Sequence, residues 1–186
     1  LQPVSVRHHL KPLEEASIIE SYEEEPKGVG RPRVLYHIAR RPDPVTFPRR
    51  DYLALSEFFI STAELLLGRT EAEKLLSSVG LEMGEITCKR IEAENRIREW
   101  SLKAFEEHFI RGYLQEAGAE PEIANSDNGS ITYRLHNCLL LELAVKYPEL
   151  ICRAYHDSYD LGLSRGTGQR LRIARKSCLG EGAPYC

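Results

Sequence analysis

The sequence predicts an α+β protein, and three patterns support that prediction. Apolar residues recur at helical spacing through residues 51–118 and again through 138–163. Alternating segments separated by turn signals predict β-hairpins at residues 18–38 and 121–136. Four of the five cysteines follow residue 137. We therefore expect a mixed fold whose last part is organised around its sulfur atoms.

Composition bounds the class of protein. The chain has 186 residues, enough for one large domain or two small ones, and its 42% apolar and 28% charged residues are ordinary for a globular protein. It has no apolar run of about 18 residues and no signal-peptide core, so we expect no membrane span and a cytoplasmic location. In a reducing compartment, clustered cysteines are more often metal ligands or redox groups than structural disulfides. Because the chain begins with Leu1, we expect it to be a fragment of a longer protein.

Residues 3–16 predict an amphipathic helix. Pro3 suits the first helical position, and Val6, Leu10 and Leu13 recur on one face, although Pro12 should weaken or kink the helix. The other side carries polar and cationic residues that suit phosphates and base edges in a DNA major groove: Ser5, Arg7, His8 and Lys11. A solvated amphipathic helix is the alternative.

Two alternating segments, 18–24 and 33–38, predict a β-hairpin with a Gly-, Pro- and cation-rich tip. A helix followed directly by such a hairpin is the back half of a winged helix. Arg31 is then placed for a minor groove, and Lys27 and Arg33 for phosphates. Residues 1–50 carry nine Lys/Arg against seven Asp/Glu, whereas the remainder carries sixteen against twenty-one. This weak asymmetry fits DNA contact through the head only; a hairpin with a solvated tip is the alternative.

The middle of the chain predicts a linker and a helical segment. We assign residues 1–40 to the partial winged helix, and the Pro- and Arg-rich residues 41–50 to a stiff linker. Residues 51–118 predict three helices, the first ending at Gly68. Apolar stripes like theirs usually form a core, but in dimeric regulators they can pair across a two-fold axis. We expect a homodimer, with Cys88 as a buried small hydrophobe.

Residues 119–186 predict a small α+β domain. After the hairpin, helices are expected at 138–147 and 149–163, a short strand at 171–176, and a glycine-rich closing loop at 178–186. Cys138 should begin a helix, where the helix dipole favours thiolate.

The four late cysteines are separated by 13, 25 and 7 residues. This spacing contains no CxxC and leaves three interpretations open: buried packing residues, a metal or iron–sulfur site, and a redox disulfide. Arg175 and Lys176 could balance thiolate charge beside Cys178, and Gly180 and Gly182 could let backbone N–H groups approach the sulfurs. His136 and His156 are substitute ligands.

Motifs for other chemistry are weak. Residues 162–166, GLSRG, match the letters of a nucleophile elbow, but that motif needs a strand before Ser164 and a helix after it, and a helix precedes it here. No HExxH, P-loop or GxGxxG occurs. We therefore expect a protein that is not an enzyme.

Three segments of the chain resemble the SufR-type winged-helix repressors, relatives of the ArsR and DeoR groups. They are residues 6–38, FPRRDYLAL at 47–55, and RLHNCLLLELAVKYPELIC at 134–152 with the later GxxxC. The resemblance covers nearly the whole chain. It implies a homodimeric regulator that binds double-stranded DNA and senses iron–sulfur or redox status through a 4Fe-4S or 2Fe-2S cluster. The family's ligands carry over to Cys138, Cys152 and Cys178, and less closely to Cys186, while HNCLLLE departs from the NCPY-like family form.

Two alternatives stay open beside this hypothesis. In one, the DNA-binding head is kept and the C-terminal domain senses zinc or a small molecule. In the other, the chain is a cysteine-dependent enzyme or ligand-binding protein without a DNA function.

Overall fold

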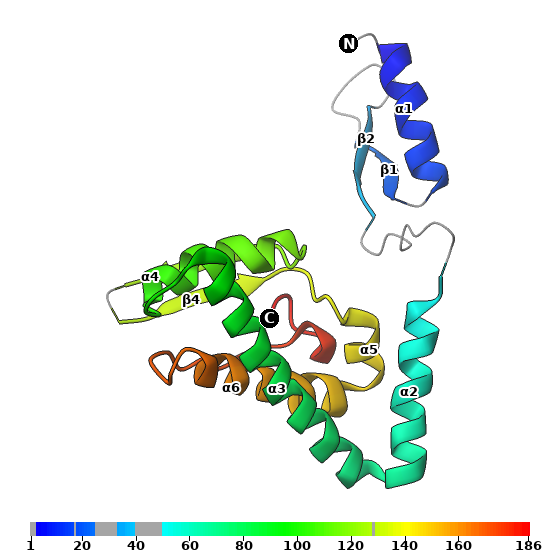
Figure 1. Cartoon of the computed structure of the whole chain (residues 1–186). Helices are drawn as coiled ribbons and strands as arrows, with labels where there is room; N and C mark the ends of the chain where they lie inside the picture. The colour runs from blue at the N-terminus through cyan, green and yellow to red at the C-terminus, as the bar shows by residue number, and fades with distance from the viewer. Residues whose placement is uncertain (1–2, 17, 25–32, 40–49, 128) are drawn as a thin grey trace. The chain divides into compact units, whose positions relative to one another are not determined.

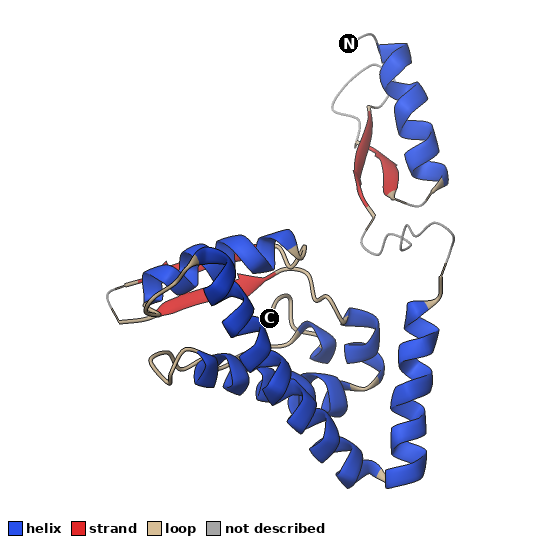
Figure 2. Ribbon diagram, in the orientation of Figure 1, coloured by secondary structure: helices blue, strands red, loops and turns tan. Residues whose placement is uncertain are grey.

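The chain folds as a mixed α+β protein, as predicted, in two units, Leu1–Asp51 and Tyr52–Cys186. The computed structural model describes residues 3–16, 18–24, 33–39, 50–127 and 129–186. Figures 1 and 2 show its helices and its two antiparallel β-hairpins. Among the described helices, none combines the length and apolarity that a membrane crossing requires.

In its described residues, the first unit contains one helix and one hairpin. Helix α1 (Pro3–Glu15) is followed by strands β1 (Ile19–Glu23) and β2 (Val34–Ile38), which pair antiparallel from Ile19 opposite Ile38 to Glu23 opposite Val34. The predicted helix and strands are therefore confirmed, with Pro12 inside the helix. The hairpin tip, with Lys27 and Arg31, and most of the predicted linker lie outside the described residues.

The second unit is built around one long helix, α3 (Arg69–Asn95). Helix α2 (Tyr52–Leu67) precedes it and ends just before Gly68, as predicted. A short helix α4 (Leu102–Ala104), begun by the Ser101 cap, continues into the wider π-helical η1 (Phe105–Leu114). The predicted hairpin follows as β3 (Pro121–Ser126) and β4 (Ile131–Leu135).

The last third of the chain supplies three further helical pieces. These are α5 (Leu141–Lys146), the π-helical η2 (Glu149–His156) running into α6 (Asp157–Gly166), and a 3-10 turn η3 (Leu179–Glu181). The strand predicted at 171–176 is wrong. That segment runs beside α6 without a partner strand, and the Ile173 N–H donates to the Ser164 hydroxyl instead of to a sheet.

Helix α3 packs closely against η2 and α6 (Figure 1) because its buried face is made of small residues. A Cβ on Gly80 would lie 2.2 Å from the Tyr155 carbonyl oxygen of η2, and one on Gly84 would lie 2.2 Å from that of Tyr159 in α6. The i,i+4 glycine pair therefore lets two helix backbones touch, and this contact fixes where η2 carries Cys152.

Two apolar clusters complete the second unit. One surrounds the aromatic row of η1, where Phe105 and Phe109 stack with ring centroids 4.7 Å apart, and it includes Trp100 and Cys88. The burial of Cys88, at 2% exposure, is confirmed. The other cluster joins α2, α5 and η2 to the end of the chain, and it contains the four late cysteines.

Candidate metal centre

Four cysteines from separate segments meet in one apolar cluster of the second unit. Cys152 lies on η2, Cys178 directly precedes η3, and both are almost fully buried at 2% and 3% exposure. Cys138 lies in the turn before α5, and Cys186 ends the chain; both are half-buried against the same cluster. The structure therefore brings together residues that lie up to 48 positions apart in the sequence.

Cys178 is the common neighbour of the other three sulfurs. Its thiol donates to Cys152 Sγ at 3.0 Å. Cys138 and Cys186 each interact electrostatically with Cys178 and with each other. All five cysteines of the chain are free thiols.

Backbone pairing holds the chain end at this cluster. Cys186 N donates to the Leu135 carbonyl at 3.0 Å, and Leu135 N donates to the Cys186 carbonyl at 2.9 Å, so the end of the chain lies along β4. The Leu179 N–H donates to Cys186 Sγ at 3.2 Å. This is a backbone donor to sulfur of the kind expected from the closing loop, although it comes from Leu179 and not from either glycine.

Gly180 has a packing role instead. A Cβ at this position would lie 2.7 Å from the Ala144 Cβ of α5, so the absence of a side chain lets η3 lie directly on that helix. Gly182 adopts φ +89°, a left-handed conformation that ends the turn. Both glycines thereby shape the loop that carries Cys178 and Cys186.

Burial raises the pKa of three of these thiols. It raises the pKa of Cys152 to about 12 and that of Cys186 to about 11, and it raises the pKa of Cys138. The prediction that Cys138 begins a helix is wrong, because α5 begins only at Leu141, and burial has a larger effect on the pKa of this thiol than the local backbone hydrogen bond. A bound metal would oppose the effect of burial, since a coordinating thiol is deprotonated, and metal uptake would release protons.

Arg175 places a positive charge beside the sulfurs. Its side chain is 14% exposed, and its guanidinium donates to the Cys152 carbonyl at 2.6 Å and to Asp157 Oδ1 at 2.7 Å. The sequence placed this charge beside Cys178 but carried no signal for the contact with Cys152, because only the fold brings η2 next to residue 175. Lys176 is exposed.

The two histidines considered as substitute ligands lie outside this cluster. His136 Nε2 lies 2.7 Å from Glu122 Oε2 on the hairpin. His156 packs against Tyr155 and Tyr159, and its buried Nδ1 has no hydrogen-bond partner. Burial lowers the pKa of His156, which keeps the ring neutral.

The donor set suits a soft metal or a cluster, although the sulfurs are not arranged around one ion position. Across the described ranges, no group of three or more His, Cys, Asp or Glu side chains is placed to hold a metal ion. A tetrahedral zinc with Zn–S bonds of about 2.3 Å separates its sulfurs by roughly 3.8 Å, more than the 3.0 Å between Cys152 and Cys178. The chemistry fits, because four thiols and a buried cation are gathered in one place.

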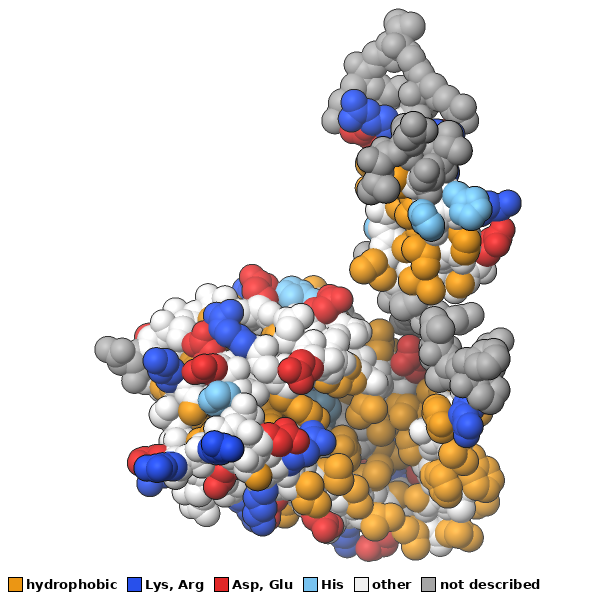
Figure 3. Space-filling model, turned by 45° about the horizontal axis from the view of Figure 1, so that its top comes forward, with side chains coloured by type: hydrophobic (Ala, Val, Ile, Leu, Met, Phe, Trp, Pro, Cys, Tyr) orange, Lys and Arg blue, Asp and Glu red, His pale blue; other side chains and the backbone are white. Residues whose placement is uncertain are grey.

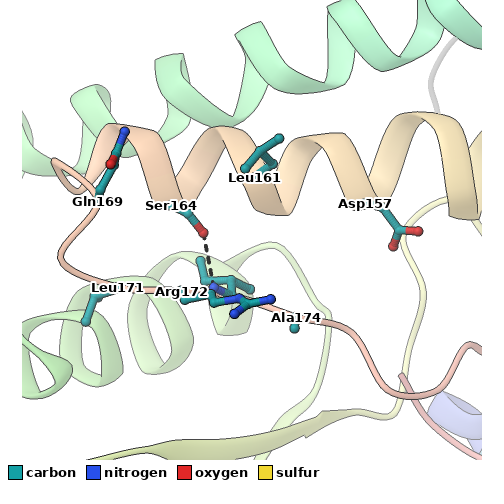
Figure 4. A pocket seen from close by; sticks show the side chains of 8 residues that line it. Asp157, Leu161, Ser164, Gln169, Leu171, Arg172 and Ala174 are labelled. Atoms are coloured by element: carbon teal, nitrogen blue, oxygen red, sulfur yellow. Dashed lines mark hydrogen bonds between the residues drawn. The ribbon is translucent and has the colours of Figure 1, made fainter.

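A separate cavity of about 440 Å³ lies between α6 and residues 169–174 (Figure 4). Ser164 lines it, but the serine hydroxyl donates to the Asp160 carbonyl and accepts from Ile173 N. Asp157, also at its edge, is paired with Arg175. The serine therefore ties the loop to α6, and no cysteine lines this cavity.

The residues predicted to contact DNA lie in the first unit. Arg7, His8 and Lys11 are exposed on α1, and Arg33 is exposed just before β2. Lys11 Nζ lies 3.7 Å from Glu15 on the same helix. Ser5 lies in α1, and Lys27 and Arg31 fall outside the described residues.

Comparison of the chain with protein-family models, curated proteins and solved structures finds no match. The function is therefore inferred from the chain's own residues.

Proposed function

We propose that this chain is a dimeric DNA-binding transcriptional repressor that senses iron–sulfur or redox status through its C-terminal cysteines. The observation that supports this most directly is the meeting of Cys138, Cys152, Cys178 and Cys186 in one apolar cluster. Buried cysteines that serve only as packing have no need to gather, and three of the five buried or half-buried thiols here contact or adjoin Cys178.

In this proposal, those four residues hold the iron–sulfur cluster. The cluster, when bound, supplies reversible electron transfer and sensitivity to oxidants. The protein excludes water with apolar neighbours, and Arg175 offsets negative charge at the thiolates. The Leu179 N–H is a donor that stabilises charge on Cys186.

The first unit would be the back half of a winged helix. Helix α1 would read the major groove through Ser5, Arg7, His8 and Lys11, and the hairpin would contact the minor groove and phosphates through Lys27, Arg31 and Arg33. Exposure of the described cations on α1 supports this role, because phosphate contacts need side chains that reach out of the fold. A dimer would place two such heads on two half-sites.

The test of the sensor is metal content. The full chain is prepared anaerobically, and iron, sulfide and zinc are assayed beside the visible absorption spectrum. We expect iron and sulfide with visible absorption, and their loss in Cys178→Ser but not in Cys88→Ser, because Cys88 lies in the other apolar cluster. A colourless protein without iron after anaerobic reconstitution would rule out the cluster, and stoichiometric zinc without iron would select the zinc sensor.

The DNA function has its own test. Binding of the full chain to duplex DNA is measured by fluorescence anisotropy from roughly 50 to 200 mM salt, where phosphate contacts weaken steeply. We expect Arg7→Ala and Lys11→Ala to weaken binding and flatten the salt dependence, with Glu14→Ala as the control on the same helix. No binding by the wild type at the lowest salt would contradict the proposal.

A second candidate function is a redox dithiol. It is favoured by the 3.0 Å contact between the Cys152 and Cys178 sulfurs. With a peroxide as oxidant, the two thiols would lose two protons and two electrons to form a disulfide, and the peroxide would become water. Loss of two titratable thiols on mild oxidation of a metal-free protein, reversed by dithiothreitol, would select this function.

A further inference from the structure

Helix α2 presents a broad apolar face to solvent. The exposed fraction of its outward residues runs from 49% for Leu55 to 85% for Leu65. The six residues of this surface, which we call the α2 face, are Tyr52, Leu55, Phe58, Phe59, Leu65 and Leu66. Figure 3 shows hydrophobic side chains gathered over this helix, at the lower right of the view. Stripes of this kind normally lie inside a protein.

The opposite side of α2 fixes the direction of this face. Ile60 is buried in the cysteine-containing apolar cluster. Glu57 accepts a hydrogen bond from Lys146 of α5 at 2.7 Å, and the Ser61 hydroxyl lies 3.2 Å from the Tyr147 hydroxyl. Because polar and apolar contacts hold the inner side on α5, the α2 face cannot turn inward without breaking them.

The size of the α2 face is that of a protein interface. Its three aromatic side chains, of about 150–250 Å² each, are 58–62% exposed, and its three leucines are 49–85% exposed, so the six residues offer on the order of 700 Å² of apolar surface. A standard interface buries about 800 Å² on each partner, whereas the largest apolar patch of a typical monomer is about 300–600 Å². A neighbouring exposed stripe on α3 extends the apolar area: Leu75, Val79, Met83 and Ile86.

The charge pattern selects the kind of partner. Helix α2 contains no Lys or Arg, and its two acidic residues, Glu57 and Glu64, are paired with Lys146 and Arg69. The α2 face is therefore a poor site for DNA or anionic lipid surfaces, because both are bound through cations on the contacting surface and this helix has none. An uncharged apolar face is complementary to itself, which is the requirement for a two-fold contact between identical chains.

We propose that the α2 face docks on the α2 face of a second copy of this chain. The contact would pair two apolar helix faces as in a helix bundle, while the ion pairs of Glu57 and Glu64 stay on the inner side of α2, away from the contact. This inference rests on the proposed function only for the identity of the partner, since a dimeric regulator needs such a surface.

The test is the mass of the full chain in solution, measured by light scattering. One chain has a mass of 21.2 kDa, so a wild-type dimer should give about 42 kDa. The double variant Phe59→Glu/Leu66→Glu places charges on side chains that are 61% and 75% exposed, so the fold of one chain should tolerate it. We expect the dissociation constant to rise at least about a hundredfold, which is about 2.7 kcal/mol. Leu161→Glu, on an equally apolar residue of α6 that is 49% exposed, should leave the dimer intact.

Iron content is measured on the same samples and should be unchanged, so that a failed interface and a failed metal site give different results. Circular dichroism shows whether the two glutamates reduce the helix content. If they do, the variant Phe59→Ser/Leu66→Ser replaces them, and its mass in solution is measured in the same way. A monomeric wild type at about 100 µM, or a double variant that stays dimeric, overturns the proposal. A monomer that instead sediments with phosphatidylcholine vesicles assigns the face to lipid and overturns it as well.

Discussion

Replacing Gly80 with alanine tests the backbone contact that positions Cys152. The new Cβ would lie 2.2 Å from the Tyr155 carbonyl oxygen and 3.0 Å from its carbonyl carbon, and a backbone atom cannot rotate aside as a side chain can. Overpacking of this kind costs about 1–3 kcal/mol, and we take the upper end because η2 must move by about 1 Å. The higher helix propensity of alanine stabilises the helix by about 1 kcal/mol relative to glycine, so the free energy of unfolding should fall by about 2 kcal/mol in total.

Thermal unfolding followed by circular dichroism measures this loss. A net loss of about 2 kcal/mol lowers the Tm by roughly 8 °C for a unit of this size. Gly112→Ala is the matched control, because the nearest heavy atom to its Cβ is 3.4 Å away and the same gain in propensity should raise the Tm slightly. An unchanged or higher Tm for Gly80→Ala would refute the close contact between α3 and η2.

Two further predictions concern Arg175 and its electrostatic neighbour Asp160. Arg175→Gln removes the donor to the Cys152 carbonyl, so we expect about 1–3 kcal/mol lower stability in urea and reduced iron retention, with the exposed Arg172→Gln unaffected. Burial raises the pKa of Asp160 to about 7. Between about pH 4 and pH 7 this carboxyl ionises in the unfolded chain but stays protonated in the folded one, so the free energy of unfolding falls as the pH rises through this window. Asp160→Asn should therefore stabilise the protein on the order of 2–4 kcal/mol at pH 8 and far less at pH 4.5; equal gains at both pH values would contradict this.

Local patterns were sufficient to predict most of the elements. The stripe of Val6, Leu10 and Leu13 predicted α1, and the SDNGS turn predicted the second hairpin, where Asp127 accepts from the N–H groups of Gly129 and Ser130 at 2.8 and 2.7 Å. These signals act within a few residues, which is why the sequence carries them. The strand expected at 171–176 failed because alternation cannot show whether a partner strand is available.

The sequence could suggest that the cysteines gather, but it could not specify how. Intervals of 13, 25 and 7 residues do not determine which sulfurs meet, because the meeting depends on η3 lying on α5 and on the end of the chain pairing with β4. Neither contact has a local sequence signal. The Gly80 and Gly84 pair did carry a signal, since an i,i+4 glycine spacing on a helix indicates close packing.

The apolar stripe of α2 is a second feature whose residues the sequence predicts but whose packing partner it does not. The 3.6-residue periodicity of the sequence joins Tyr52, Leu55, Phe59, Ala63 and Leu66 in one stripe, but it could not distinguish a core from an interface: Ala63 packs against the cysteine-containing cluster, and the other four are exposed. Only the structure shows that α3 and α5 occupy the opposite side and leave this face to solvent.

Iron and sulfide content of the anaerobically prepared full chain tests the central claim most directly. The proposed function predicts both elements in the wild type and in Cys88→Ser, with loss of both in Cys152→Ser and Cys178→Ser. Equal metal content in all four proteins, or no iron in any of them after reconstitution, would contradict it.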